Sequence, residues 1–147
     1  VYGGAADELG LLPAFSRAMA DYPANLLVTD LQKANYSLSK RQHFVTGEGD
    51  ASLGWLAGAR FATCHLGMIV WELLYLGIPT SVFSKTERHL ETAMEMYRRG
   101  MVMAWPEMGL PADDKLREFL LLPFEPSGDE TIDLLGAGRA LELMEAG

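Results

Sequence analysis

The sequence predicts an α/β protein, a three-layer α/β/α Rossmann-like sandwich with a parallel sheet of about six strands. Short apolar runs that are typical of buried strands alternate with segments in which apolar residues recur at helical spacing. This alternation favours parallel strands joined by right-handed helical crossovers, with helices on both faces of the sheet. A length of 147 residues, with 49% apolar and 22% charged residues, fits one globular domain over residues 1–147.

In the first half of the chain, helical spacing and one proline set the predicted order. Leu11, Phe15 and Met19 recur at helical spacing, and Pro23 ends this helix because proline disfavours helical backbone at the residue before it. A short helix begins at Asp50 or Ser52, either of which can cap it, and ends at residue 57. Residues 30–41 are polar and carry no clear pattern. The strands expected here are residues 1–2, 25–29 and 43–46, and the longer helix is residues 9–20.

In the second half, glycines mark the ends of two predicted helices. Gly77 stops one helix together with Ile78 and Pro79, and Gly100 lies just past the end of another. Residues 123–129 form a loop rich in proline and glycine. The expected strands are residues 60–64, 80–83 and 101–104, and the expected helices are residues 68–76, 87–99, 113–122 and 132–145.

Bulk properties exclude several classes of function. The net charge of −8 argues against binding to duplex nucleic acid, which needs clustered Lys and Arg. No apolar run approaches the ~18 residues that a membrane span requires. Cys64 is the single cysteine, which rules out an intrachain disulfide and fits a reducing, cytoplasmic compartment. The chain starts at Val1 in a strand-like segment, without Met or a signal peptide, so we expect a piece of a longer polypeptide.

The segment 59–77 is the strongest functional signal, since a strand, a glycine, a helix and a second strand follow one another there. Gly67 precedes the helix, and Glu72 lies five residues further on. Its neighbours in the sequence are apolar, so we expect little of the solvent-exposed side of the helix to be available to Glu72. The first amides of a helix attract phosphate, and a carboxylate one turn in can accept hydrogen bonds from ribose hydroxyls. The pattern therefore predicts half of a nucleotide site, with a tight turn followed by a solvent-facing Glu72 as the alternative.

Other candidate residues carry weaker signals. Gly3 and Gly4 follow a strand and could turn bare amides toward a phosphate, although a turn with positive φ explains them equally well and G-x-G-x-x-G is absent. His89 lies near the start of a helix at the same sheet edge, where an ordinary surface histidine is the alternative. Cys64 and His65 are neighbours in a strand and point to opposite faces, so we expect no metal site, and a core thiol is favoured over a nucleophile.

Four stretches of the chain resemble the C-terminal half of glycosyltransferase-B-fold proteins, most closely the UDP-sugar hydrolases of pseudaminic-acid biosynthesis and spore-coat polysaccharide biosynthesis proteins. These stretches are VYGGAAD, CHLGMIVWELLYLGIPTSVF, KTERHLETA and IDLLGAGRALELM. The resemblance implies that Glu72 holds the ribose of a UDP-sugar and that the amides of Gly3, Gly4, Gly67 and Met68 hold the diphosphate. It places His89 where the family usually has Gln.

The resemblance also implies what this chain lacks. The family usually has Ser and Thr after the helix glycine, and Met68 and Ile69 stand there, so two hydroxyl donors for phosphate are gone. In the family the catalytic base comes from an N-terminal partner domain, so we assign no catalytic residue and no cofactor here. We expect the UDP-sugar-binding half of a hydrolase or glycosyltransferase of bacterial surface-glycan or nonulosonic-acid biosynthesis, inactive by itself.

Two alternatives remain open. The first is a degenerate, non-catalytic module for domain packing or dimerisation, which Met68 and Ile69 favour and which includes a homodimer. The second is an unrelated Rossmann-like enzyme that uses Cys64 or His65.

Overall fold

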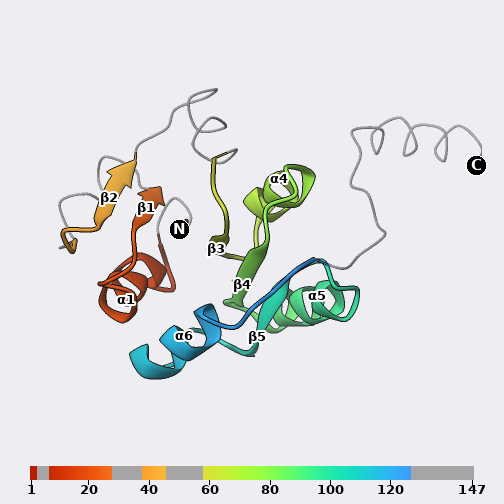
Figure 1. Cartoon of the computed structure of the whole chain (residues 1–147). Coiled ribbons are helices and arrows are strands. Elements are labelled where there is room, and N and C mark those ends of the chain that lie inside the picture. The colour runs from red at the N-terminus through yellow and green to blue at the C-terminus, as the bar shows by residue number, and fades with distance from the viewer. Residues whose placement is uncertain (3–6, 28–37, 46–57, 127–147) are drawn as a thin grey trace, which may run out of the picture.

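A computed structural model describes residues 1–2, 7–27, 38–45 and 58–126 (Figure 1). The predicted helices at residues 50–57 and 132–145 lie outside these residues, as do Gly3 and Gly4. The described part is a mixed α/β structure with parallel strands, compatible with a Rossmann-like fold.

Within the described residues, five parallel strands form two small sheets, which corrects the expectation of about six strands in one sheet. Strands β1 (Ala24–Leu27) and β2 (Gln42–Val45) pair with each other. Strands β3 (Ala62–His65), β4 (Thr80–Ser84) and β5 (Met103–Met108) form the second sheet, with β4 in the middle. The predicted first strand is reduced to one bridge between Tyr2 and Cys64, because two residues are too few to make the successive pairs of a strand.

Residues 1–2 nevertheless lie between the two sheets. The Val1 nitrogen donates to the Asn25 carbonyl of β1 at 2.8 Å, and the Tyr2 amide donates to the Thr63 carbonyl of β3 at 2.9 Å. The spatial order is therefore β2, β1, residues 1–2, β3, β4, β5. The order of connection reverses between residues 1–2 and β3, and ligands of open α/β sheets bind at the carboxyl ends of the strands beside such a reversal.

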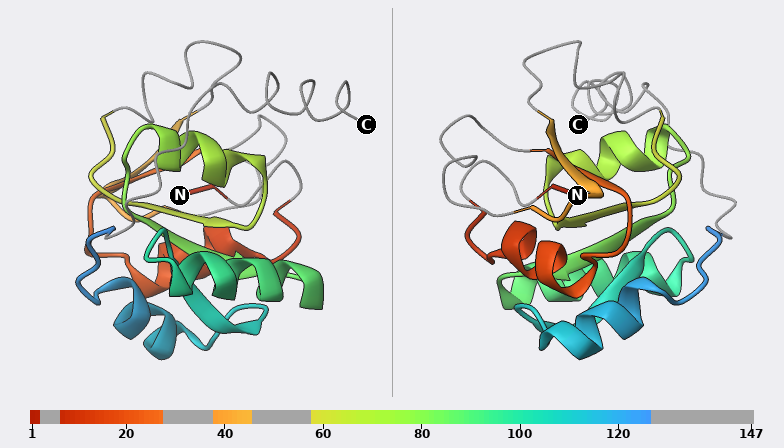
Figure 2. Two further views of the ribbon diagram at one scale, coloured as in Figure 1. Left: turned by 90° about the vertical axis from the view of Figure 1, so that its right-hand side faces the viewer. Right: turned by 60° about the vertical axis from the view of Figure 1, so that its left-hand side comes forward.

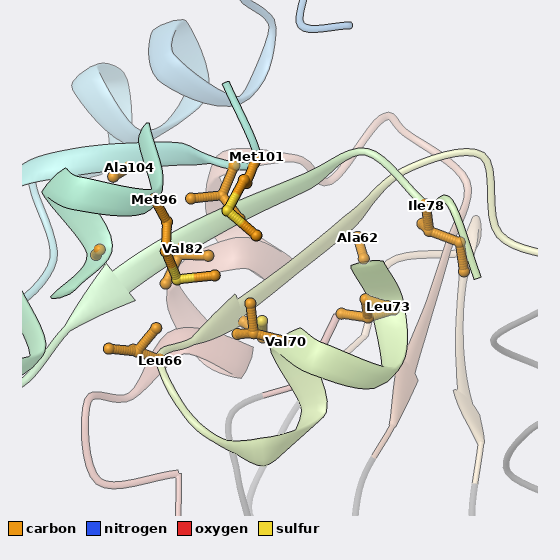
Figure 3. Packing of buried hydrophobic residues seen from close by; sticks show 12 residues of the cluster. Ala62, Leu66, Val70, Leu73, Ile78, Val82, Met96, Met101 and Ala104 are labelled. Carbon is orange, nitrogen blue, oxygen red and sulfur yellow. The ribbon is translucent and has the colours of Figure 1, made fainter. Parts of the chain in front are cut away.

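Helices cover both faces of the sheet that contains β4 (Figure 2). On one face, α4 (Met68–Tyr75) and α5 (Glu87–Arg98) enclose a cluster around Val82 of β4. Figure 3 shows Val70 of α4 and Met96 of α5 converging near Val82. On the other face, α1 (Leu11–Ala18) and α6 (Asp113–Leu120) pack around Phe83.

The boundaries of most elements agree with the sequence prediction, because the chain carries local stop signals. Gly77 and Gly100 adopt left-handed backbone, with φ of 68° and 70°, just past the ends of α4 and α5. The exception is β5, which was expected over residues 101–104 and instead extends to Met108 through Pro106. A proline is tolerated there because β5 pairs only with β4, through a register shift between Val82 and Ser84.

Within the described ranges, no helix has the length and apolar character needed to span a bilayer.

Hydrogen bonds from Arg117 also join α6 to the end of α1 and to Asp21 just after it. Arg117 of α6 donates to the Ala18 carbonyl at 2.8 Å and to both carboxylate oxygens of Asp21 at 2.6 and 2.9 Å. This bidentate bond from Arg117 holds the pKa of Asp21 at about 2, below its usual value near 4.

Replacing Phe83 by Ala removes the ring that packs edge-on against Phe119, with 5.5 Å between the ring centroids. Because Phe83 is 0% exposed, we expect the free energy of unfolding to fall by about 3–5 kcal/mol. Urea unfolding followed by circular dichroism measures this loss. The control Tyr97→Ala, on the exposed face of α5, should cost much less, and equal losses would contradict the packing described here.

The Asp21–Arg117 pair should make stability depend on pH. The pKa of Asp21 is lower in the folded protein than in the unfolded chain. The ion pair therefore stabilises the folded protein at pH values above the unfolded pKa of about 4, and this stabilisation is lost as the pH falls toward 2. Urea midpoints of the wild type and Asp21→Asn should therefore differ at pH 6 and converge near pH 2. The exposed Glu125→Gln serves as the control. If the urea midpoints of the wild type and Asp21→Asn differed as much at pH 2 as at pH 6, the charge of Asp21 would not be the source of the stabilisation.

Candidate functional site

The amino terminus of α4 lies at the carboxyl edge of the sheet, directly after β3. Strand β3 ends at His65, and α4 begins at Met68 with Gly67 at its N-cap position. No side chain caps this helix, and its first turn carries no acidic residue. Within the described residues, the amides of Met68 and Ile69 therefore have no side-chain cap, and the positive end of the helix dipole faces this edge.

The two neighbouring helices that begin at this edge are capped. The buried carboxylate of Asp7 accepts hydrogen bonds from the amides of Leu11 at 2.9 Å and Leu12 at 3.1 Å, and so neutralises the start of α1. The Thr86 hydroxyl accepts from the His89 amide at 3.2 Å at the start of α5. Of these three helix starts, that of α4 is the one without a side-chain cap among the described residues.

Gly67 has extended backbone, with φ of −176° and ψ of −172°, a conformation that any residue adopts. Its lack of a side chain instead leaves space beside His65. A Cβ atom built at Gly67 would lie 3.6 Å from two atoms of the His65 ring, which is an ordinary contact. Gly67 can therefore be replaced without backbone strain.

Glu72 lies on α4 four residues after Met68, about one turn along the same side of the helix. The expectation that its apolar neighbours leave it little room on a wet face is wrong, because Glu72 is exposed. Helix α4 buries Val70 and Leu73, and it packs the partly buried Ile69 and Leu74 against the same cluster, whereas Glu72 lies on its exposed side. Among the residues that the structure describes, the Glu72 carboxylate has no ion-pair partner and can meet a ligand.

His65, which the sequence analysis named only in its last alternative and not as a nucleotide-binding residue, lies at the start of α4. Its Nδ1 atom is buried and has no hydrogen-bond partner among the described residues, and its ring centroid lies 6.5 Å from that of Tyr2, with the ring beside Gly67. Each ring nitrogen of a histidine donates or accepts according to tautomer, so the hydrogen-bonding capacity of this atom beside Gly67 is unused among the described residues. Its position as the last residue of a strand, two before a glycine, was the available sequence signal.

Two further polar atoms near this edge, the Ser84 hydroxyl oxygen and the His89 Nδ1 atom, are buried and have no hydrogen-bond partner in the described part of the chain. Ser84 ends β4, and His89 is the third residue of α5, so His89 lies near the edge where the sequence placed it. His89 is partly buried rather than an ordinary surface histidine. Lys85 lies between these two residues in the chain and pairs with Glu8 at 2.6 Å. This bond lowers the pKa of Glu8.

Cys64 belongs to the core rather than to the site. It is 0% exposed, within the cluster under α4 and α5, and burial raises the pKa of its thiol to about 12. A thiol in this state is not a nucleophile at neutral pH. Across the described segments, no three His, Cys, Asp or Glu side chains lie close enough to hold a metal ion.

Comparison with protein-family models, curated proteins and solved structures found no match.

A carboxylate at the N-cap position of α4 should stabilise the helix. Gly67→Asp supplies both a cap for the first amides and a negative charge at the positive end of the dipole, so the free energy of unfolding should rise by about 0.5 kcal/mol. Gly67→Ala, which adds a Cβ without a cap, is the matched control and should not gain. Urea unfolding measures both variants. A loss of stability in Gly67→Asp relative to Gly67→Ala would show that the start of α4 is already compensated.

Proposed function

We propose that this chain binds the nucleoside diphosphate of a UDP-sugar at the carboxyl edge of its sheet. The observation that carries the proposal is the uncapped start of α4, which lies directly after β3 with the unpartnered His65 Nδ1 beside it. The resemblance to nucleotide-sugar enzymes described above points to the same ligand class. The chain would be the donor-binding half of a cytoplasmic hydrolase or glycosyltransferase of bacterial surface-glycan synthesis.

In this proposal, two parts of α4 bind two parts of the ligand. The diphosphate oxygens accept hydrogen bonds from the amides of Gly67, Met68 and Ile69, where the dipole favours negative charge. His65 adds a side-chain bond at the same end. Glu72, one turn further, accepts hydrogen bonds from the ribose hydroxyls, and a carboxylate with two oxygens suits a vicinal diol.

The proposed site differs from one that uses hydroxyl side chains. The Met68 side chain is 78% exposed and offers phosphate no donor, so recognition of the diphosphate depends on backbone amides and His65. Gly3, Gly4 and His89 remain proposed contributors, and His89 would act from the first turn of α5. We assign no general base or nucleophile to the described residues, and the proposed reaction needs a partner domain on the other side of the ligand.

A second candidate function is favoured by the exposed face of α4. This apolar surface consists of Met68, Trp71, Tyr75 and Leu76, which are between 37% and 78% exposed. Exposed apolar surface of this kind marks protein–protein contacts. A packing or dimerisation module would use this face without binding nucleotide, and concentration-dependent self-association without a UDP response would favour it.

Isothermal titration with UDP and with uridine tests the proposed contacts. Glu72→Ala removes the acceptor for ribose, so the affinity for both ligands should fall about tenfold or more, as expected for hydrogen bonds to a charged group. Glu118→Ala, an exposed carboxylate on α6 at the other face of the sheet, is the matched control and should bind as the wild type does. Unchanged UDP affinity in Glu72→Ala would refute the role given to Glu72.

The same titration with Gly67→Asp tests the diphosphate contact separately. An aspartate at this position occupies the amides of α4 and repels phosphate, so UDP binding should be lost while uridine binding remains. The variant is expected to fold, because backbone geometry and space at Gly67 accept a side chain. Equal UDP affinity in Gly67→Asp and the wild type would place the diphosphate elsewhere.

A further inference from the structure

Lys85 and Glu8 form an ion pair at the carboxyl edge of the sheet, and neither has been assigned to the proposed nucleotide site. The Lys85 Nζ atom lies 2.6 Å from the Glu8 Oε2 atom. Lys85 follows directly after β4, and Glu8 lies in the turn between Asp7 and the start of α1. The ion pair therefore links the middle strand of its sheet to the segment that leads into α1.

The register of the strands places Lys85 next to the start of α4. His65 of β3 is opposite Phe83 of β4, and the Leu66 amide donates to the Phe83 carbonyl at 2.8 Å. Gly67 and Lys85 each follow two residues after this matched pair. Because parallel strands advance together along the ladder, Gly67 and Lys85 leave the sheet from adjacent positions on the same edge.

His65 lies between the ion pair and the start of α4. Cys64 packs in the cluster under α4 and α5, so alternation along β3 turns its neighbour His65 toward the side of α1, where Glu8 lies. The hydrogen bond and charge of Lys85 lower the pKa of Glu8, and the charge of His65 lowers it further. The His65 ring also lies beside Gly67. The ion pair and the first residues of α4 thus border on the same histidine.

The two partners of the ion pair differ in how firmly they are held. Glu8 follows Asp7, whose carboxylate accepts hydrogen bonds from the amides of Leu11 and Leu12, so the turn that carries Glu8 is anchored to α1. Lys85 reaches the Glu8 carboxylate through a flexible four-carbon stem, and its side chain is 30% exposed. Since exposed ion pairs contribute little net free energy, the Lys85 ammonium can exchange this carboxylate for a phosphate oxygen at small cost.

We propose that Lys85 is a further specificity-determining residue, which binds the diphosphate and has Glu8 as its counterion in the unliganded protein. This role rests on the proposed function, because the phosphate that attracts Lys85 is the one bound at the start of α4. The α4 side chains of Met68 and Ile69 offer phosphate no charge, and Lys85 supplies a cation at the same edge. A nucleoside without phosphate cannot draw Lys85 from Glu8, so the exchange selects for phosphorylated ligands.

Titration calorimetry of the whole chain with UDP and with uridine separates the role of Lys85 from that of the other contacts. Lys85→Met removes the ammonium, so the affinity for UDP should fall about tenfold or more while the affinity for uridine stays the same. Glu8→Gln removes the competing carboxylate, so the affinity for UDP should rise about threefold. The matched control for charge is Lys40→Met, an exposed lysine just before β2, which should bind both ligands as the wild type does.

A second lysine variant distinguishes lost charge from lost structure. Lys85→Arg keeps the cation, so its affinity for UDP should stay within about threefold of the wild type. If UDP bound Lys85→Met and the wild type equally well, while Gly67→Asp lost UDP, the role of Lys85 would be refuted and the proposed nucleotide site would stand. A wild type that bound no UDP would refute both. A fall in UDP affinity in Glu8→Gln as large as that in Lys85→Met would overturn the role of Glu8 as a competitor, because the ion pair would then hold the site together.

Discussion

Parallel pairing of β3 with β4 is the interaction on which the rest of this structure depends. Strand β4 is buried along its whole length, with Val82 under α4 and α5 and Phe83 under α1 and α6. A parallel sheet needs a crossover between consecutive strands, and the crossover helix must cover a face of the sheet. The carboxyl ends of the strands therefore share one edge, where the start of every crossover helix also lies.

At this edge the amino termini of the helices differ in how they are capped. Asp7 neutralises the start of α1 and Thr86 caps α5, whereas the start of α4 has no cap from a side chain. Leaving amides uncompensated costs stability, which is why N-caps are so common in helices. An uncapped helix start beside the His65 Nδ1 atom, which has no hydrogen-bond partner among the described residues, is thus more informative than a glycine in the sequence alone.

Local signals explain how much of the fold the sequence could predict. Helix α4 was expected to end at residue 76 and α5 at residue 99, and both end within one residue of those positions because Gly77 and Gly100 adopt the left-handed backbone that stops a helix. The candidate site was predicted less well. Whether the Glu72 side chain is exposed depends on how few residues of α4 are buried against the sheet. Its apolar neighbours in the sequence suggested that it would not be exposed, and it is exposed.

The sequence by itself determined the alternation of strands and helices, the ends of most helices and the position of Gly67 at the start of one of them. These features depend on backbone preferences within a few residues, so they can be recognised without the fold. Only the tertiary structure decided that His65 lies against Gly67 and that residues 1–2 lie between β1 and β3. These features arise from the order of strands in space, and contacts between segments distant in the chain set that order.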